Sequence, residues 1–212
     1  MNRQTVFLVD DDPSVLRAVS RLLREAGFEV FGFPSAAAYL LHYDNDVPGC
    51  AVLDVSLGDV HGLDLLRATA TDDYARPTIF ITGSSDIATS IRAMKCGAID
   101  FLTKPVDAVV LITAVREAIE RDRHTRAHAA RRAGVASLLS GLTPRERDVL
   151  SRVVEGRLNK QIAAELNIAE KTVKFHRGRL MAKMKARSVA DLVRITMGNT
   201  AASSPRMVAT GT

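Results

Sequence analysis

The sequence lacks tryptophan and has few aromatic residues of any kind, 5% of its 212 residues. Its two cysteines, Cys50 and Cys96, lie far apart in apolar surroundings, which favours buried, reduced thiols over a disulfide framework or a zinc site. Long hydrophobic runs are also missing. The apolar stretch 6–9 is too short for a signal peptide, and no other stretch could span a bilayer. These absences predict a cytoplasmic protein with no membrane partner.

Each part of the chain is poor in charge of one sign. Residues 1–123 carry 12 Lys and Arg against 18 Asp and Glu, whereas residues 124–212 carry 17 against 6. The net charge of +5 for the whole chain hides this division. We interpret the acidic and basic parts as having separate tasks, and we expect the basic part to bind a polyanion.

Strand-like and helix-like segments alternate through the first 120 residues. The strand-like apolar runs are VFLV (6–9), EVFGF (29–33), CAVL (50–53), TIFI (78–81) and AIDFL (98–102). Stretches with apolar residues at helical spacing separate them, and some of these end at a glycine, as at Gly27 and Gly97. The alternation predicts an α/β fold of the flavodoxin-like kind, a doubly wound five-stranded parallel sheet with helices on both faces.

Four of the five predicted strands end in residues that can carry chemistry. They are Asp10, Asp11 and Asp12 after the first strand, Asp54 after the third, Thr82 after the fourth and Lys104 after the fifth. In such a sheet the carboxyl ends of the strands meet at one edge. Carboxylates gathered there repel one another, but they suit Mg²⁺, while Lys104 and the Thr82 hydroxyl could bind an oxyanion. Although Asp12 before Pro13 also suits a helix N-cap, the set predicts a phosphoryl site with a carboxylate nucleophile.

Residues 1–120 resemble a response-regulator receiver domain. The matching residues are the acidic pair Asp10 and Asp11, then Asp54, Thr82, Phe101, and Lys104 followed by Pro105. The resemblance implies Mg²⁺-dependent phosphorylation of Asp54 by a sensor histidine kinase, with Thr82 and Phe101 as switch residues. It also implies four metal ligands: Asp10, Asp11, Asp54 and the backbone carbonyl of Ser56. The chain departs from the family at Gly58, where proline is usual, and we expect a looser loop there.

A second domain follows a predicted linker. In residues 121–140 Arg, His and Ala largely replace large apolar residues, which predicts a partly helical linker that extends the last receiver helix. Residues 141–200 show helical periodicity without strand-like runs and predict a smaller all-α domain. Its expected helices begin at Thr143-Pro144, at Asn159 and near Glu170, in helix-turn-helix order. Residues 201–212 predict a disordered tail.

Residues 142–200 resemble LuxR-type helix-turn-helix domains through LTPRERDVL, NKQIA and KTVKFHR. The whole chain resembles the FixJ/NarL family of transcriptional response regulators, and its C-terminal half is nearest FixJ. The resemblance implies a recognition helix at 170–184, and a homodimer on phosphorylation that binds inverted-repeat double-stranded DNA, with RNA polymerase as a further partner. The residues expected to contact DNA are Asn159, Lys160, Lys171, Thr172, Lys174, Phe175, Arg177, Gly178 and Arg179.

Two other functions fit parts of the pattern. A phosphoaspartyl phosphohydrolase would use the same aspartates, but such enzymes usually carry the nucleophile in a D-x-D motif at the first strand, and the sequence shows no cap domain. A DNA-binding protein with a receiver used only for docking would not need the complete set of acidic, Thr and Lys residues. We therefore predict a transcription factor switched by phosphorylation, by family habit an activator, and not an enzyme.

Overall fold

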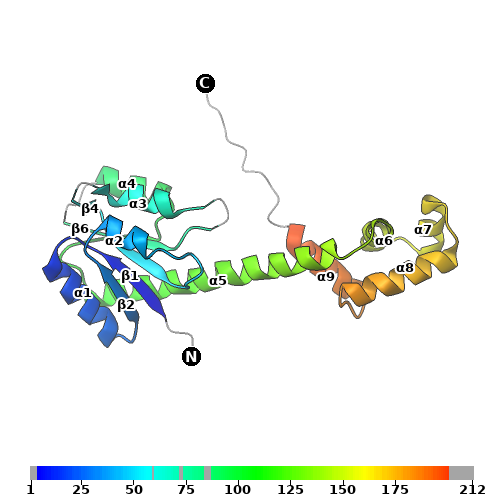
Figure 1. The fold of residues 1–212 in the computed structure, drawn as a ribbon, viewed down its shortest axis with the longest axis horizontal. Coiled ribbons are helices and arrows are strands. Elements are labelled where there is room, and N and C mark those ends of the chain that lie inside the picture. Colours follow the sequence, from blue (N-terminus) through cyan, green and yellow to red (C-terminus); the bar gives the residue numbers. More distant parts are fainter. Residues whose placement is uncertain (1–3, 59, 72–73, 84–86, 201–212) are drawn as a thin grey trace, which may run out of the picture. The chain divides into compact units, whose positions relative to one another are not determined.

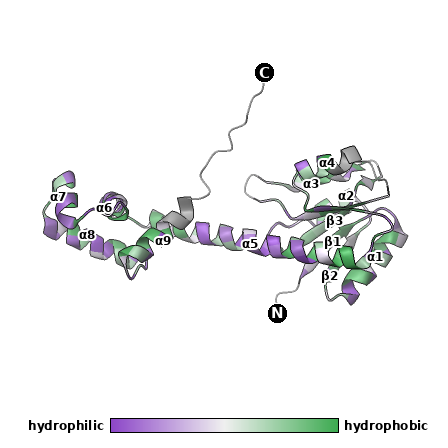
Figure 2. Cartoon of the chain, turned by 180° about the vertical axis from the view of Figure 1, so that it is seen from behind, coloured by the Kyte–Doolittle hydropathy of each residue, from purple (hydrophilic) through white to green (hydrophobic). Residues whose placement is uncertain are grey.

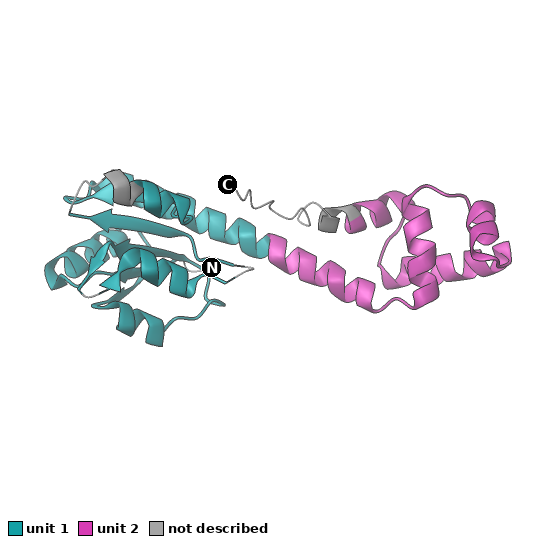
Figure 3. Cartoon of the chain, turned by 90° about the horizontal axis from the view of Figure 1, so that it is seen from above, with its two compact units in different colours: residues 1–127 teal, residues 128–212 magenta. Residues whose placement is uncertain are grey.

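The computed structural model describes residues 4–58, 60–71, 74–83 and 87–200 (Figure 1). The chain divides into two compact units, Met1–Ala127 (unit 1) and His128–Thr212 (unit 2), which Figure 3 colours separately. The division falls inside the predicted linker of residues 121–140. The predicted disordered tail, residues 201–212, lies outside the described residues.

Unit 1 contains the predicted five-stranded parallel sheet. Its strands are β1 (Thr5–Val9), β2 (Glu29–Phe33), β3 (Cys50–Asp54), β6 (Thr78–Thr82) and β7 (Asp100–Thr103). They run in the order β2-β1-β3-β6-β7, and every neighbouring pair is parallel. The order reverses between β1 and β3, which confirms the doubly wound fold and places the switch point between the strands that end at Val9 and Asp54.

Helices cover both faces of the sheet because successive strand residues point to opposite sides. Leu8 faces α1 (Pro13–Glu25) and α5 (Ala108–Ser140), where it packs in one core cluster with Leu23 and Val115. Its neighbour Phe7 belongs to a second cluster, formed with α2 (Ala36–Leu41), α3 (Gly62–Thr69) and α4 (Ile87–Lys95). Much of the sheet is accordingly coloured green, the colour of hydrophobic residues, in Figure 2.

Two short features were not predicted from the sequence. The six-residue helix α2 is capped by Ser35, whose hydroxyl accepts from the amide of Ala38 at 3.1 Å. In the loop after β3, β4 (Ser56–Leu57) pairs antiparallel with β5 (Val60–His61). Both features are too short to produce an apolar periodicity that sequence reasoning can detect.

In its described residues, unit 2 contains the end of α5 followed by α6 (Pro144–Val154), α7 (Asn159–Leu166), α8 (Glu170–Lys183) and α9 (Val189–Thr200). Val173 and Leu180 of α8, and Met184 directly after it, are buried in the core of the unit. Asn167 adopts a left-handed conformation (φ 53°) and ends α7, as the predicted turn requires. In the described part of the chain, no helix is long and apolar enough to cross a membrane.

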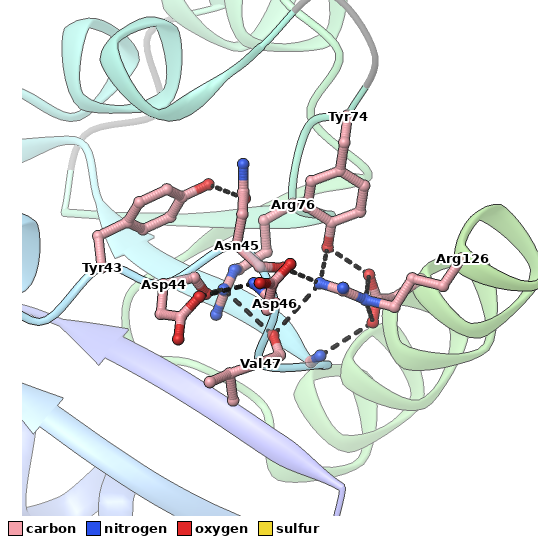
Figure 4. Close-up of polar contacts among 10 residues, drawn as sticks. Tyr43, Asp44, Asn45, Asp46, Val47, Tyr74, Arg76 and Arg126 are labelled. Carbon is pink, nitrogen blue, oxygen red and sulfur yellow. Dashed lines mark hydrogen bonds and ion pairs between the residues drawn. The ribbon is translucent and has the colours of Figure 1, made fainter. Parts of the chain in front are cut away.

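The middle of α5 is held to unit 1 by a polar cluster on the amino-terminal side of β3 (Figure 4). The buried Asp122 carboxylate accepts hydrogen bonds from the Gly49 amide at 2.9 Å, from Arg126 Nε at 2.8 Å and from the Tyr74 hydroxyl. Arg126 also donates to two loop carbonyls, those of Asn45 and Val47. Residues 121–127 are therefore part of unit 1 and are fully helical, although hydrophilic residues predominate there (Figure 2).

A second arginine supports the same loop from the sheet side. Arg76 is buried and donates through one guanidinium nitrogen to the carbonyls of Asp44 and Val47. Its guanidinium carbon lies 3.9 Å from the centroid of the Phe7 ring. The carbonyl of Val47 thus accepts from both arginines, and the loop before β3 is fixed between them (Figure 4).

We expect Asp122→Asn to destabilise unit 1 by roughly 2–4 kcal/mol, because the half-buried Arg126 guanidinium would lose its buried counter-charge. The three tyrosines, at positions 39, 43 and 74, all lie in unit 1, so tyrosine fluorescence during urea denaturation of the full-length protein follows this unit. Arg123→Gln is the matched control, since its ion pair with Glu120 is exposed and should contribute less than about 0.5 kcal/mol. Equal losses in the two variants would contradict the assignment.

Candidate functional site

The predicted acidic residues converge at the carboxyl edge of the sheet. One carboxylate oxygen from each of Asp10, Asp11 and Asp54 lies within 4.8 Å of the others. Asp10 follows β1 and Asp54 ends β3, and the parallel pairing of these strands sets the two side by side. Asp10 is fully buried and Asp54 nearly so, whereas Asp11 is exposed. The cluster is therefore open to solvent on the side of Asp11.

The third aspartate of the triplet has another role. Asp12 is the N-cap of α1, where its carboxylate accepts from the amide of Ser14 at 2.7 Å and from that of Val15 at 3.4 Å. Pro13 takes the first helical position, which needs no amide donor. This confirms the predicted cap and leaves Asp10 and Asp11 to the acidic cluster.

Lys104 connects the two buried carboxylates. Its Nζ donates to Asp10 Oδ2 at 2.8 Å and to Asp54 Oδ2 at 2.6 Å. Its amide donates to the carbonyl of Thr82 at 2.7 Å, which joins the end of β7 to the end of β6. Burial raises the pKa of Asp10, and the hydrogen bond from Lys104 opposes that rise. Burial lowers the pKa of Lys104, but the hydrogen bonds to the two carboxylates and their negative charge together outweigh this effect, so the pKa lies above its usual value.

The donor set fits a hard divalent cation. One ammonium group cannot compensate three carboxylates, and carboxylate oxygens are the ligands that Mg²⁺ prefers. Ser56 lies beside the cluster, and its amide donates to Asp54 Oδ1 at 3.1 Å. Thr82 is buried at the end of β6, and Phe101 in β7 packs against the core under α2, α3 and α4.

Most of the side chains predicted to contact DNA lie exposed on unit 2. They are Lys160 on α7 and Lys171, Thr172, Lys174, Phe175 and Arg179 on α8. Gly178 is also exposed, and a Cβ atom placed there would meet nothing within 4 Å. Val173 and Leu180 are buried on the opposite side of α8. The helix thus turns a basic face outwards, as a recognition helix requires.

Two family matches cover both units. Residues 6–116 match the response regulator receiver domain, and residues 140–196 match the luxR family of bacterial regulatory proteins. The chain belongs to the response-regulator family. It is a two-component response regulator that regulates transcription and carries a LuxR-type DNA-binding domain, which confirms the resemblance to the FixJ/NarL family.

The similarity to known proteins covers nearly the whole chain. Nodulation protein W of Bradyrhizobium diazoefficiens is 47% identical over 191 residues, 90% of this chain and 84% of that protein. Transcriptional regulatory protein FixJ of Rhizobium meliloti is 38% identical and covers 93% of this chain and 97% of its own. The solved structure of response regulator StyR matches with a TM-score of 0.85 and 40% identity, over 92% of this chain and 98% of that one.

Two residues predicted to contact DNA bind each other in this response regulator. Arg177 Nη1 donates to Asn159 Oδ1 at 2.8 Å, and both residues are half-buried. The contact ties the middle of α8 to the first residue of α7. On the exposed side, Lys174 lies 3.4 Å from Glu170, and the Arg179 guanidinium lies 5.6 Å from the Phe175 ring centroid.

The buried carboxylate of Glu146 links the start of α6 to the end of α8. Glu146 completes a capping box with Thr143, which confirms the predicted start of α6. Its carboxylate also accepts from Lys183 Nζ at 2.7 Å, at the last residue of α8. The hydrogen bonds from Lys183 and from the Thr143 amide lower the pKa of Glu146 from 4.5 to about 2. No local pattern links the two residues, which are 37 positions apart.

Because the pKa of Glu146 is lower in the folded protein, its contribution to the stability of unit 2 is complete above pH 4.5 and lost as the pH falls towards about 2. Glu146→Gln keeps a side chain that suits a capping box but loses the charge, so it should destabilise unit 2 at neutral pH. The difference from wild type should shrink in acid.

Urea titrations of the full-length protein, followed by the amide NMR signals of Val173 and Leu180, test this at neutral pH and at about pH 3. The control is Glu155→Gln, since Glu155 is an exposed carboxylate of the same unit. A stability difference between Glu146→Gln and wild type that does not change with pH would contradict the ion-pair assignment.

Proposed function

We propose that Asp54 accepts a phosphoryl group from a histidine kinase and that Mg²⁺ binds to Asp10, Asp11, Asp54 and the Ser56 carbonyl. The observation that carries the proposal is the position of Lys104, which donates to Asp54 at 2.6 Å and to Asp10 at 2.8 Å beside a solvent-facing carboxylate. A cation that reaches both a nucleophile and a metal-binding carboxylate suits a site that gathers phosphoryl oxygens.

In the proposed transfer, an Asp54 carboxylate oxygen attacks the phosphorus atom of a phosphohistidine. An O–P bond forms, the P–N bond breaks, and its electron pair remains on the imidazole nitrogen. The product is an acyl phosphate on Asp54. Bound Mg²⁺ would neutralise the charge on the transferred oxygens. The Lys104 ammonium, which donates to both carboxylates in the free site, would move its hydrogen bond from Asp54 to a phosphoryl oxygen.

Phosphorylation is proposed to produce a homodimer through α4, β7 and α5. The Thr82 hydroxyl would move to the new phosphoryl oxygens, and Phe101 would rotate into the space it leaves. Support comes from large apolar side chains that are exposed on these helices: Ile91 and Met94 on α4, and Val109 and Val110 on α5. Lys95 is exposed and Asp100 half-buried on the same elements, so both are available for polar contacts.

The dimer is proposed to bind an inverted repeat in double-stranded DNA, with α8 in the major groove. On this DNA the dimer would act together with RNA polymerase. Lys174 and Phe175, both exposed, would reach base edges, and the exposed Gly178 would allow a close approach of the helix to the groove. The remaining contacts would go to phosphates, from Asn159, Lys160, Lys171, Thr172, Arg177 and Arg179. Arg177 and Asn159 already bind each other, so they would meet the backbone as a pre-positioned pair.

Asp54→Asn should abolish phosphorylation, because an amide oxygen is not a competent nucleophile here. Full-length protein incubated with radiolabelled acetyl phosphate and Mg²⁺ should acquire an acid-stable, base-labile label. Asp64→Asn is the control, since Asp64 is an exposed carboxylate on α3 and should leave labelling unchanged. Label that persists in Asp54→Asn would place the acceptor elsewhere.

Lys174→Ala should weaken binding to the specific site by roughly 1–3 kcal/mol and relax base preference at one position of each half-site. Lys171→Ala is the comparison, because loss of a phosphate contact should weaken binding to all sequences alike and lower the salt slope by about one. Selection from a randomised site library by phosphorylated wild type and both variants distinguishes these roles. Identical base preferences in wild type and Lys174→Ala would show that Lys174 contacts phosphate.

A further inference from the structure

The turn between β4 and β5 contacts the acidic cluster through a backbone amide. Gly58 lies in this turn, and its N–H donates to Asp11 Oδ2 at 3.1 Å. The bond joins residues 47 positions apart. We propose that the Gly58 amide positions the Asp11 carboxylate for the divalent cation, and so links the β4–β5 hairpin to the metal site.

The backbone at this position requires a residue that tolerates a left-handed conformation. Gly58 has φ +62°, yet a Cβ atom there would meet nothing within 4 Å. The left-handed backbone conformation, and not a lack of space for a side chain, therefore favours glycine at this position. Proline, usual here in receiver domains, has φ near −65° and no N–H, so it could neither adopt this turn nor donate to Asp11. The glycine that stands here in place of the usual proline thus supplies a hydrogen bond to the acidic cluster.

Each carboxylate of the cluster accepts one backbone amide. Asp10 accepts from the amide of Asp12 at 3.0 Å, and Asp54 accepts from that of Ser56 at 3.1 Å. Both of these donors are local in sequence, and Lys104 restrains the same two carboxylates. Asp11 is the exposed member of the set, and its amide donor comes from the hairpin, at Gly58. Asp10 and Asp54 are thus held in place by burial and by Lys104. The Gly58 N–H restrains the Asp11 carboxylate instead.

A hydrogen-bond donor to a metal-binding carboxylate has a measurable effect on the affinity for the metal. A carboxylate that gives one oxygen to a metal is oriented by a hydrogen bond to its other oxygen, and loss of such a partner typically costs about 10–100-fold in metal affinity. The hairpin is itself anchored, because Leu57 is buried in the core and the Gly62 amide donates to the Val55 carbonyl at 2.8 Å. It can therefore hold Asp11 at a fixed distance from Asp54.

The inference rests on the proposed Mg²⁺ site, so the test measures binding of Mg²⁺ alone to the unphosphorylated full-length protein by NMR titration. Gly58→Pro removes the N–H and should weaken Mg²⁺ binding about 10–100-fold. Gly58→Asn is the matched variant, because asparagine keeps the N–H and tolerates positive φ, and it should bind close to wild type. Tyrosine fluorescence in urea checks that unit 1 is folded in each variant.

A second measurement needs no metal. Without Mg²⁺, exchange of the residue 58 amide hydrogen should be slow in wild type and Gly58→Asn, and faster in Asp11→Ala, which lacks the acceptor. Equal exchange in wild type and Asp11→Ala, or wild-type Mg²⁺ affinity in Gly58→Pro, would overturn this inference alone. Equal weakening by Gly58→Pro and Gly58→Asn would overturn it too. A wild-type protein that binds no Mg²⁺ would overturn the cation site of the proposed function as well.

Discussion

The receiver depends on the compensation of negative charge at one edge of its sheet. The parallel order places β1 beside β3, so Asp10 and Asp54 must lie close together in a buried position. Lys104 stabilises this arrangement by donating to both, but one ammonium group cannot balance three carboxylates. The residual negative charge is what would attract the proposed divalent cation. The same cluster of carboxylates therefore determines both the position of Lys104 and the proposed metal site.

Unit 2 uses a buried carboxylate for a different purpose. Glu146 is held by the amide of Thr143 as well as by Lys183, so its ion pair fixes the end of α8. Lys104, in contrast, has two competing acceptors, and a phosphoryl group would offer it better ones. Lys183 donates to a capped carboxylate and to the Gly141 carbonyl, which fixes a helix position, whereas a lysine shared between two carboxylates is suited to a switch.

Most of the fold could be predicted from the sequence, because its signals are local. Apolar runs and helical spacing identified the five strands, and the rule that strand ends share an edge identified the acidic cluster before any coordinates. Apart from the short helix α2 and the β4–β5 hairpin, what escaped prediction depends on distant partners. The Lys183–Glu146 pair spans 37 residues and the Gly58–Asp11 bond spans 47, and neither has a local pattern. The departure at Gly58 was visible, but it suggested only a looser loop, since its φ and its hydrogen bond appear only in three dimensions.

The α5 helix shows why the contact boundary of unit 1 lies beyond the predicted receiver end. Residues 121–127 lack large apolar side chains, and the sequence therefore predicted that a partly helical linker begins there. An Asp122–Arg126 pair at i, i+4 on an exposed helix would contribute only about 0.3–0.5 kcal/mol. In the structure Asp122 is buried, and the pair satisfies the Gly49 amide, the Tyr74 hydroxyl and two loop carbonyls. Polar contacts thus do here what apolar packing does elsewhere in α5, and hydrophobic periodicity cannot detect a boundary set by them.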